Sequence, residues 1–159
     1  MTIETKSKNE TLELARLLGE DIARNGTGPF VIALEGDLGA GKTTFIKGLA
    51  RGLGLTRRIT SPTFLMARRY RLRSNPRKFE SFYHVDAYRM KTARDLEVTG
   101  VAEALRGTKN IVAVEWANLI KRYLPADFIA VKIKHKKENE RILSITQMNP
   151  VRNHKLIKR

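Results

Sequence analysis

The feature that most constrains this chain is a glycine-rich turn between an apolar run and a helical pattern. The turn lies in residues 34–45, LEGDLGAGKTTF, where Gly36 to Thr43 fit the spacing G-x-x-x-x-G-K-[ST]. The apolar run Phe30 to Leu34 is short and bounded by glycines, which is typical of a buried strand, and residues 42–53 have a helical pattern. A strand, this turn and a helix, in that order, form the context in which such a loop binds phosphate.

Each residue type in the loop has a chemical reason to be there. Glycines let backbone N–H groups close around the β-phosphate of a nucleotide, and the N-terminus of the helix adds positive potential. We expect Lys42 to reach the β- and γ-phosphates, Thr43 to place its hydroxyl on Mg²⁺, and Thr44 to contact the α-phosphate side. An ordinary turn is the weaker interpretation, because the motif is complete and stands in its proper context.

Nucleotide hydrolysis needs more than this loop, because a carboxylate must hold or orient magnesium and a polar group must position water. Glu115 and Asp86 each end a run that reads as a strand, and the carboxyl ends of strands are where open α/β sheets bind ligands. Either acid alone is equally a strand-end cap or a surface ion pair, but their joint presence favours a functional pair. His84 and Arg89 lie close to Asp86 in the sequence. A lone histidine between aromatic and aliphatic residues is more often packed in a core, so we assign neither residue a catalytic role.

A candidate switch segment follows the predicted helix. Residues 59–64, ITSPTF, lie where nucleotide-binding proteins often carry a segment that senses the γ-phosphate. Pro62 fixes a turn within it. Ser61 and Thr63 either contact magnesium or water, or only satisfy turn amides, and the sequence leaves both interpretations open.

The rest of the pattern predicts an alternating α/β layout. Residues 10–24 form an amphipathic helix, and residues 63–73 and 79–86 form an extended pair. Residues 110–116, NIVAVEW, read as another buried strand. The helix should bury one stripe of large apolar side chains, namely Leu14, Leu17, Leu18 and Ile22. The extended pair should present Phe64, Met66, Tyr70 and Leu72, spaced mostly by two.

The C-terminal part has an alternating pattern on either side of KKENE, which predicts an antiparallel hairpin with one basic face. No linker divides the chain of 159 residues. We therefore expect a single domain over residues 1–159, of the α/β class with a P-loop NTPase-like fold. Its central mixed sheet should be flanked by helices, and a basic tail should occupy about residues 150–159.

Composition narrows the choice of cofactor and compartment. The chain has no cysteine, which excludes disulfides and thiolate metal sites and leaves an oxygen-liganded metal such as Mg²⁺. Neither a secretory signal nor a membrane span is apparent, so we expect a cytoplasmic protein that does not bind a membrane.

The chain is strongly basic, with 31 Lys plus Arg against 16 Asp plus Glu and a net charge of +15. A field of this sign attracts nucleic acid or other polyanions without choosing among them. The densest basic stretch is MARRYRLR, residues 66–73, followed by Arg77 and Lys78. It predicts a polyanion contact as well as it predicts a solvated hairpin face.

An ordered set of short segments resembles one known family. GDLGAGKTTF, GLARGLG, SPTF, HVDAYR, LEVTGVAEAL, VEW and LP occur in the order and spacing of the bacterial tRNA threonylcarbamoyladenosine biosynthesis ATPases, the TsaE family. The resemblance covers roughly residues 10 to 146. It implies a P-loop ATPase that associates with the TsaB–TsaD pair and sustains threonylcarbamoyl transfer to adenosine in the anticodon loop of ANN-decoding tRNAs. The chain itself would not be the transferase.

The resemblance also implies roles for individual residues. The loop Leu38, Gly39, Ala40, Gly41, Lys42 and Thr43 would bind ATP phosphates. Thr43 and Glu115 would coordinate Mg²⁺, and Asp86 would be the acid needed for hydrolysis. Thr11 matches a position that approaches the base, and Trp116 matches a tryptophan near the site, although its pattern alone predicts a core residue. Contact of tRNA with the basic surface or the tail NPVRNHKLIKR is a hypothesis beyond the resemblance.

Two rival functions belong to other classes. A small-molecule kinase would share the phosphate loop and use the arginine-rich stretch as a lid over its substrate. A noncatalytic nucleic-acid-binding module would explain the charge but not the loop, the acids and the switch segment together. A GTPase is disfavoured because the chain has no N-K-x-D sequence for guanine recognition.

Overall fold

A computed structural model describes residues 1–73 and 79–148 of the chain. Predictions that concern Arg77, Lys78 and the tail at about 150–159 lie outside these described residues. The elements, in chain order, are β1 Thr2–Thr5, α1 Lys8–Asn25, β2 Phe30–Glu35, α2 Lys42–Gly52, β3 Ala67–Arg71, β4 Ser81–Asp86, α3 Ala93–Val98, α4 Val101–Arg106, β5 Asn110–Glu115, the 3-10 helix η1 Ala117–Tyr123, β6 Phe128–His135 and β7 Arg141–Met148.

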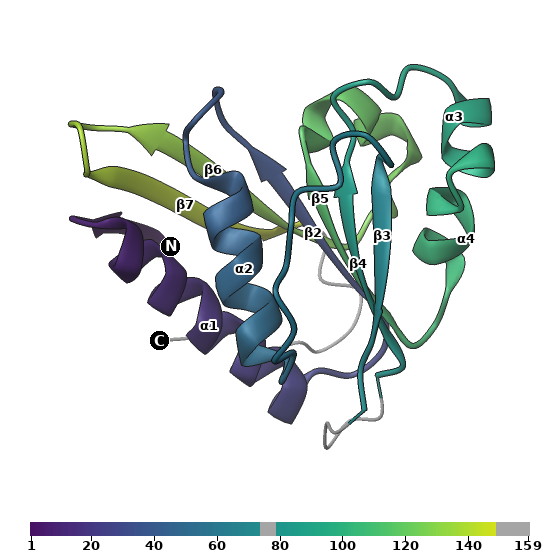
Figure 1. The fold of residues 1–159 in the computed structure, drawn as a ribbon, viewed down its shortest axis with the longest axis horizontal. Helices are drawn as coiled ribbons and strands as arrows, with labels where there is room; N and C mark the ends of the chain where they lie inside the picture. The colour runs from purple at the N-terminus through teal and green to yellow at the C-terminus, as the bar shows by residue number, and fades with distance from the viewer. Residues whose placement is uncertain (74–78, 149–159) are drawn as a thin grey trace.

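The seven strands form one mixed sheet in the order β1-β7-β6-β2-β5-β4-β3 (Figure 1). Strand β2 is parallel to both β5 and β6, and β4 is parallel to β5. The outer pairings of β7 with β6 and β1, and of β3 with β4, are antiparallel. The predicted mixed sheet and C-terminal antiparallel hairpin are confirmed.

Helices cover both faces of the sheet because successive residues of its buried central strands point to opposite faces. Ile32 and Leu34 of β2 join α1 and α2 in one apolar core. Val31 and Ala33 of the same strand join α3, α4 and η1 in the other core. In Figure 1, α1 and α2 lie together beside the sheet, and α3 and α4 lie apart from them at its other end.

The two helices on the first face pack closely because glycines lie between them. A Cβ atom added at Gly48 would come within 2.1 Å of the carbonyl oxygen of Leu12, and one at Gly52 within 2.0 Å of that of Arg16. The expected leucine stripe of α1 is therefore wrong in part. Small side chains fill the contact: the buried residues of α1 are Thr11, Ala15, Gly19, Ile22 and Ala23. Leu14 and Leu18 are partly buried at its margin, whereas Leu17 is 51% exposed.

The extended pair also begins later than its spacing predicts. Phe64 is 90% exposed in a turn, and strand β3 starts only at Ala67, after Met66 takes a left-handed conformation with φ 59°. Tyr70 and Leu72 are buried as expected. The N-terminal strand β1, which pairs with β7, is an element that sequence periodicity does not predict. None of the described helices is long and apolar enough to cross a membrane.

Candidate functional site

The phosphate loop follows the carboxyl end of β2, and its glycines are needed for its shape. Gly39 and Gly41 have φ values of 75° and 110°, in the left-handed region that side chains disfavour. At Gly36, with φ 151°, a Cβ atom would lie 2.4 Å from the carbonyl oxygen of Ile133. The loop is thus pressed against β6 and delivers the chain into α2 at Lys42. Backbone N–H groups at the start of a helix in such a turn are of the kind that can bind an anion.

The Lys42 side chain is buried within this turn. Its ammonium donates to the carbonyl oxygens of Gly36 and Asp37, at 2.6 and 2.8 Å, and lies 3.7 Å from the centre of the Trp116 ring. Burial lowers the pKa of Lys42, and the negative charges of Glu115, Asp86 and Asp37 oppose that shift. A phosphate group arriving at the loop would offset the same desolvation.

Two side chains contact Glu115 at the end of β5. The hydroxyl of Thr43 lies 2.9 and 3.0 Å from its two carboxylate oxygens, and Nε2 of His84 lies 2.7 Å from Oε1. His84 is fully buried, and its Nδ1 has no hydrogen-bond partner among the described residues. The contact with Glu115 through Nε2 is thus the hydrogen bond that the structure gives the His84 ring. His84 is packed, as its sequence context suggests, but it is packed against the site.

Asp86 lies beside Glu115, because the two residues are register partners of β4 and β5. The hydroxyl of Thr63 donates to Asp86 Oδ2 at 3.1 Å, and the backbone N–H of Tyr88 donates to Oδ1 at 3.1 Å. The hydroxyls of Ser61 and Thr63 are 2.7 Å apart. Arg89 donates to the carbonyl oxygen of Thr63. The candidate switch segment is therefore tied to the acid at the end of β4.

These groups surround one cavity of about 500 Å³, which is within the usual range for small-ligand sites. Its lining residues are Leu38, Gly39, Gly41, Lys42, Thr43, Thr44, Ser61, Thr63, Asp86, Tyr88, Glu115 and Trp116. Trp116 has a left-handed backbone with φ 58°, and its ring packs on that of Tyr88 with centroids 5.1 Å apart. An aromatic wall thus faces the lysine and the two acids.

A second cavity of about 270 Å³ adjoins the first, because Gly39, Gly41 and Thr44 line both. Its other lining residues are Lys8, Thr11, Ala40, Asn139 and Arg141. The Thr11 hydroxyl lies 2.7 Å from that of Thr5, which fixes the start of α1 against β1. Every candidate site residue from the sequence therefore lines one of these two cavities.

Comparison with known proteins identifies the family. Residues 5–143 match the family model described as "Threonylcarbamoyl adenosine biosynthesis protein TsaE". The chain belongs to the TsaE family. The recognition made from its motifs is confirmed.

Several relatives carry the name "tRNA threonylcarbamoyladenosine biosynthesis protein TsaE". The protein from Bacillus subtilis (strain 168) is 40% identical, with 89% of this chain and 82% of the relative covered. The one from Nostoc sp. is 38% identical over 89% and 83% of the two chains, and the one from Rickettsia prowazekii is 36% identical over 90% and 92%. A crystal structure of Bacillus subtilis YdiB is similar with a TM-score of 0.69 and 33% identity, covering 94% of this chain and 86% of that one.

The cavity of this TsaE-family chain is lined by oxygen ligands of the kind that magnesium takes. Within residues 1–73 and 79–148, no group of three or more His, Cys, Asp or Glu side chains is arranged to hold a metal ion. Asp86 and Glu115 are the acids that line the cavity, and Mg²⁺ is usually held by one or two carboxylates together with substrate phosphates. The hydroxyl oxygen of Thr43 lies beside one of these carboxylates, because it contacts Glu115.

Sequence reasoning missed three contributors to the TsaE-family site. Lys8, Asn139 and Arg141 line the second cavity, and Nε of Arg141 donates to the carbonyl oxygen of Ala40 at 3.0 Å. Arg141 is 101 residues away from that loop in the sequence, so no local pattern links the two. The order of the strands does link them, because β6 pairs with β2 and so brings the β6–β7 hairpin toward the phosphate loop.

Proposed function

We propose that this chain is the ATP-binding and ATP-hydrolysing subunit of the tRNA threonylcarbamoyladenosine modification machinery, acting with the TsaB–TsaD pair. The observation that carries the proposal is the convergence of Lys42, Thr43, Asp86 and Glu115 on one cavity. In this reading the chain supplies an ATPase cycle, and its partners perform the threonylcarbamoyl transfer. The cycle would operate in the cytoplasm.

The phosphates of ATP would occupy the loop from Leu38 to Thr43, with the ammonium of Lys42 moving from its carbonyl partners to the β- and γ-phosphates. Thr43 and Glu115 would hold Mg²⁺, which when bound neutralises charge on the phosphate oxygens. Asp86 would orient the water that attacks the γ-phosphate. Its present contact with Thr63 supports a coupling between this acid and the segment that carries Ser61.

The second cavity supports a place for the nucleoside. Its position beside Gly41 and Thr44 continues the path from the loop toward the start of α1, where Thr11 lies. Adenine rather than guanine is favoured by the absence of an N-K-x-D sequence from the chain. We infer that Thr11, Trp116 and Arg141 flank a bound ATP molecule.

An exposed apolar rim supports a protein partner at this site. Leu38 and Phe64 are 87% and 90% exposed, and Leu65 and Tyr88 are each 60% exposed. Leu38 and Tyr88 line the nucleotide cavity itself. Large apolar side chains grouped beside a polar site are typical of protein contacts. The TsaB–TsaD pair is the partner that family membership suggests.

The test of this proposal is the fate of the γ-phosphate. ATP labelled on that phosphate should yield free phosphate and ADP in equal amounts, without any labelled acceptor. Lys42→Ala should reduce this release at least 100-fold while Lys47→Ala, on the same helix but away from the loop, should leave it intact. Transfer of label to a small molecule would contradict the proposal and indicate a kinase.

A further inference from the structure

A strongly basic surface lies at the opposite end of the parallel strands from the nucleotide site. Glu80 and Lys109 immediately precede β4 and β5, so they mark the amino ends of these parallel strands, whereas the phosphate loop follows the carboxyl end of β2. In Figure 1 this surface is at the lower ends of α2, β3 and β4. We call it the basic face, and its cations are Lys47, Arg51, Arg57, Arg58, Arg69, Arg71, Arg73 and Lys109.

The basic face is hollowed rather than flat. One cavity of about 910 Å³ is lined by five of these cations, together with Leu72, Phe79 and a single acid, Glu80. A second cavity of about 710 Å³ is lined by four, with no acid, and Arg57 belongs to both. Arg57 thus lies between the two cavities, of which one is at the end of α2 and the other beside the edge strand β3.

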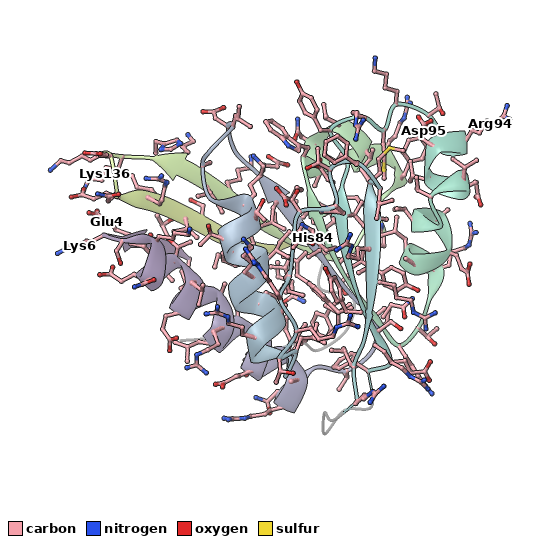
Figure 2. All side chains as sticks on the ribbon, viewed as in Figure 1. Glu4, Lys6, His84, Arg94, Asp95 and Lys136 are labelled. Atoms are coloured by element: carbon pink, nitrogen blue, oxygen red, sulfur yellow. The ribbon has the colours of Figure 1, made fainter. Side chains whose placement is uncertain are left out.

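The cations of this face are poorly neutralised by the protein. Lys109 pairs with Glu80 at 2.8 Å, which, with Arg69 and Arg71 nearby, lowers the pKa of Glu80. Within the described part of the chain, no ion pair neutralises Arg57, Arg71 or Arg73. Figure 2 shows Lys136 near Glu4 at the end of the sheet that carries β1, and these two side chains pair at 2.6 Å.

The arrangement of the arginines suits a phosphodiester backbone. Arg69 and Arg71 of the edge strand β3, and Arg73 just beyond its end, are exposed and alternate with buried Tyr70 and Leu72. Alternate residues of an extended chain lie on one side at intervals of about 6.5 Å. That interval is close to the separation of successive phosphates along a nucleic-acid strand. Six of the eight cations are arginines, whose planar groups bind phosphate through two hydrogen bonds at once.

A buried hydroxyl without a hydrogen-bond partner lies beneath the basic face. The Tyr70 hydroxyl has no hydrogen-bond partner among the described residues, although Tyr70 is only 7% exposed. Tyr70 lines a cavity of about 360 Å³ between residues 54–57 and the side chains of Arg71 and Arg73. A buried polar group without a partner is costly unless a ligand or water supplies one.

From these observations we propose that the basic face binds the sugar–phosphate backbone of a folded RNA. The inference goes beyond the proposed ATPase cycle. It does not depend on that cycle, because the two sites lie at opposite ends of the parallel strands. An acidic protein surface is the competing ligand. It is less well matched, because its carboxylates do not have the regular spacing that the alternating arginines present.

The test is a titration of an unmodified tRNA transcript with the full chain at several salt concentrations. The test variant removes three exposed arginines: Arg57→Gln, Arg71→Gln and Arg73→Gln. The control variant removes three exposed cations near α3 and η1: Lys91→Gln, Arg94→Gln and Lys121→Gln. Both variants have the same net charge, so any difference between them reports position rather than charge. Circular dichroism and denaturant unfolding check that each variant remains folded.

We expect the test variant to lower the slope of log K against log salt by about 2 to 3 and to weaken binding about tenfold or more, with the control slope changing by less than 1. Equal losses in both variants, or no RNA binding by the wild type, would overturn the inference. A parallel competition uses polyglutamate. If polyglutamate displaces the RNA as well as unlabelled RNA does at equal charge, the face is a contact for acidic protein instead.

Discussion

Asp86 and Glu115 are register partners at the carboxyl ends of the adjacent parallel strands β4 and β5. Two carboxylates in this position would repel one another without other contacts, yet each is held by its own set of donors. Thr43 and His84 contact Glu115, whereas Thr63 and Tyr88 contact Asp86. The different partners suggest different tasks. Glu115 is placed with the phosphate loop, and Asp86 is placed with the segment that carries Thr63.

The first prediction concerns this division. Asp86→Asn keeps the size of the side chain but removes its charge, so water should no longer be oriented at the γ-phosphate. We expect phosphate release to fall at least 100-fold while ATP affinity changes less than about threefold. Asp127→Asn, in the loop before β6, is the matched control. Loss of ATP binding in proportion to activity would show instead that Asp86 serves nucleotide binding.

The second prediction concerns His84 as a positioning residue. Its Nε2 lies 2.7 Å from Glu115, and donors of this kind to a metal-binding carboxylate typically change metal affinity 10- to 100-fold when they are lost. His84→Gln should therefore raise the Mg²⁺ concentration needed for half-maximal phosphate release about tenfold. Saturating Mg²⁺ should restore most of the rate. A variant with a lower rate at every Mg²⁺ concentration, and an unchanged midpoint, would assign His84 to packing alone.

The third prediction follows from the buried ammonium of Lys42, whose pKa lies below its ordinary value of 10.5. Between its folded pKa and 10.5, the unfolded chain binds more protons than the folded chain, so stability rises with pH in that window. Without nucleotide, the free energy of unfolding of the wild type should therefore increase relative to that of Lys42→Met as pH approaches 10.5. Denaturant titrations of both proteins measure this difference. A difference that stays constant, or that shrinks, would contradict the lowered pKa.

The fourth prediction tests the close packing of α1 on α2. Gly48→Ala places a methyl group where the carbonyl oxygen of Leu12 lies 2.1 Å away, so the helices must separate. Overpacking of this kind costs about 1–3 kcal/mol. Denaturant unfolding should show that loss, while Lys47→Ala on the same helix should not. Unchanged stability in Gly48→Ala would mean that the helices tolerate a wider separation.

The sequence predicted best those features that depend on local order. The loop from Gly36 to Thr43 needs only a strand before it and a helix after it, and both are present. The positions of Asp86 and Glu115 at the ends of β4 and β5 were predictable, because each apolar run stops there. The mixed sheet and the C-terminal hairpin followed from the same kind of pattern.

The features that were missed depend on contacts between distant segments. The leucines of α1 do not predict which of its side chains face α2. Gly48 and Gly52 of α2 allow the two helices to approach closely, and this approach determines which residues of α1 fit at the contact. Phe64 continues an alternating pattern in the sequence, yet the left-handed turn at Met66 removes it from the strand. Arg141 reaches the loop only because the order of the strands brings β7 near it.

The central claim is that partner proteins control ATP hydrolysis at this site. The most direct measurement is phosphate release from ATP by the purified chain, with and without the TsaB–TsaD pair, with Lys42→Ala as the inactive reference. The account predicts that the pair stimulates release at least tenfold and that the stimulation disappears in Lys42→Ala. Release that is unchanged by the pair, or stimulation that persists in Lys42→Ala, would contradict it.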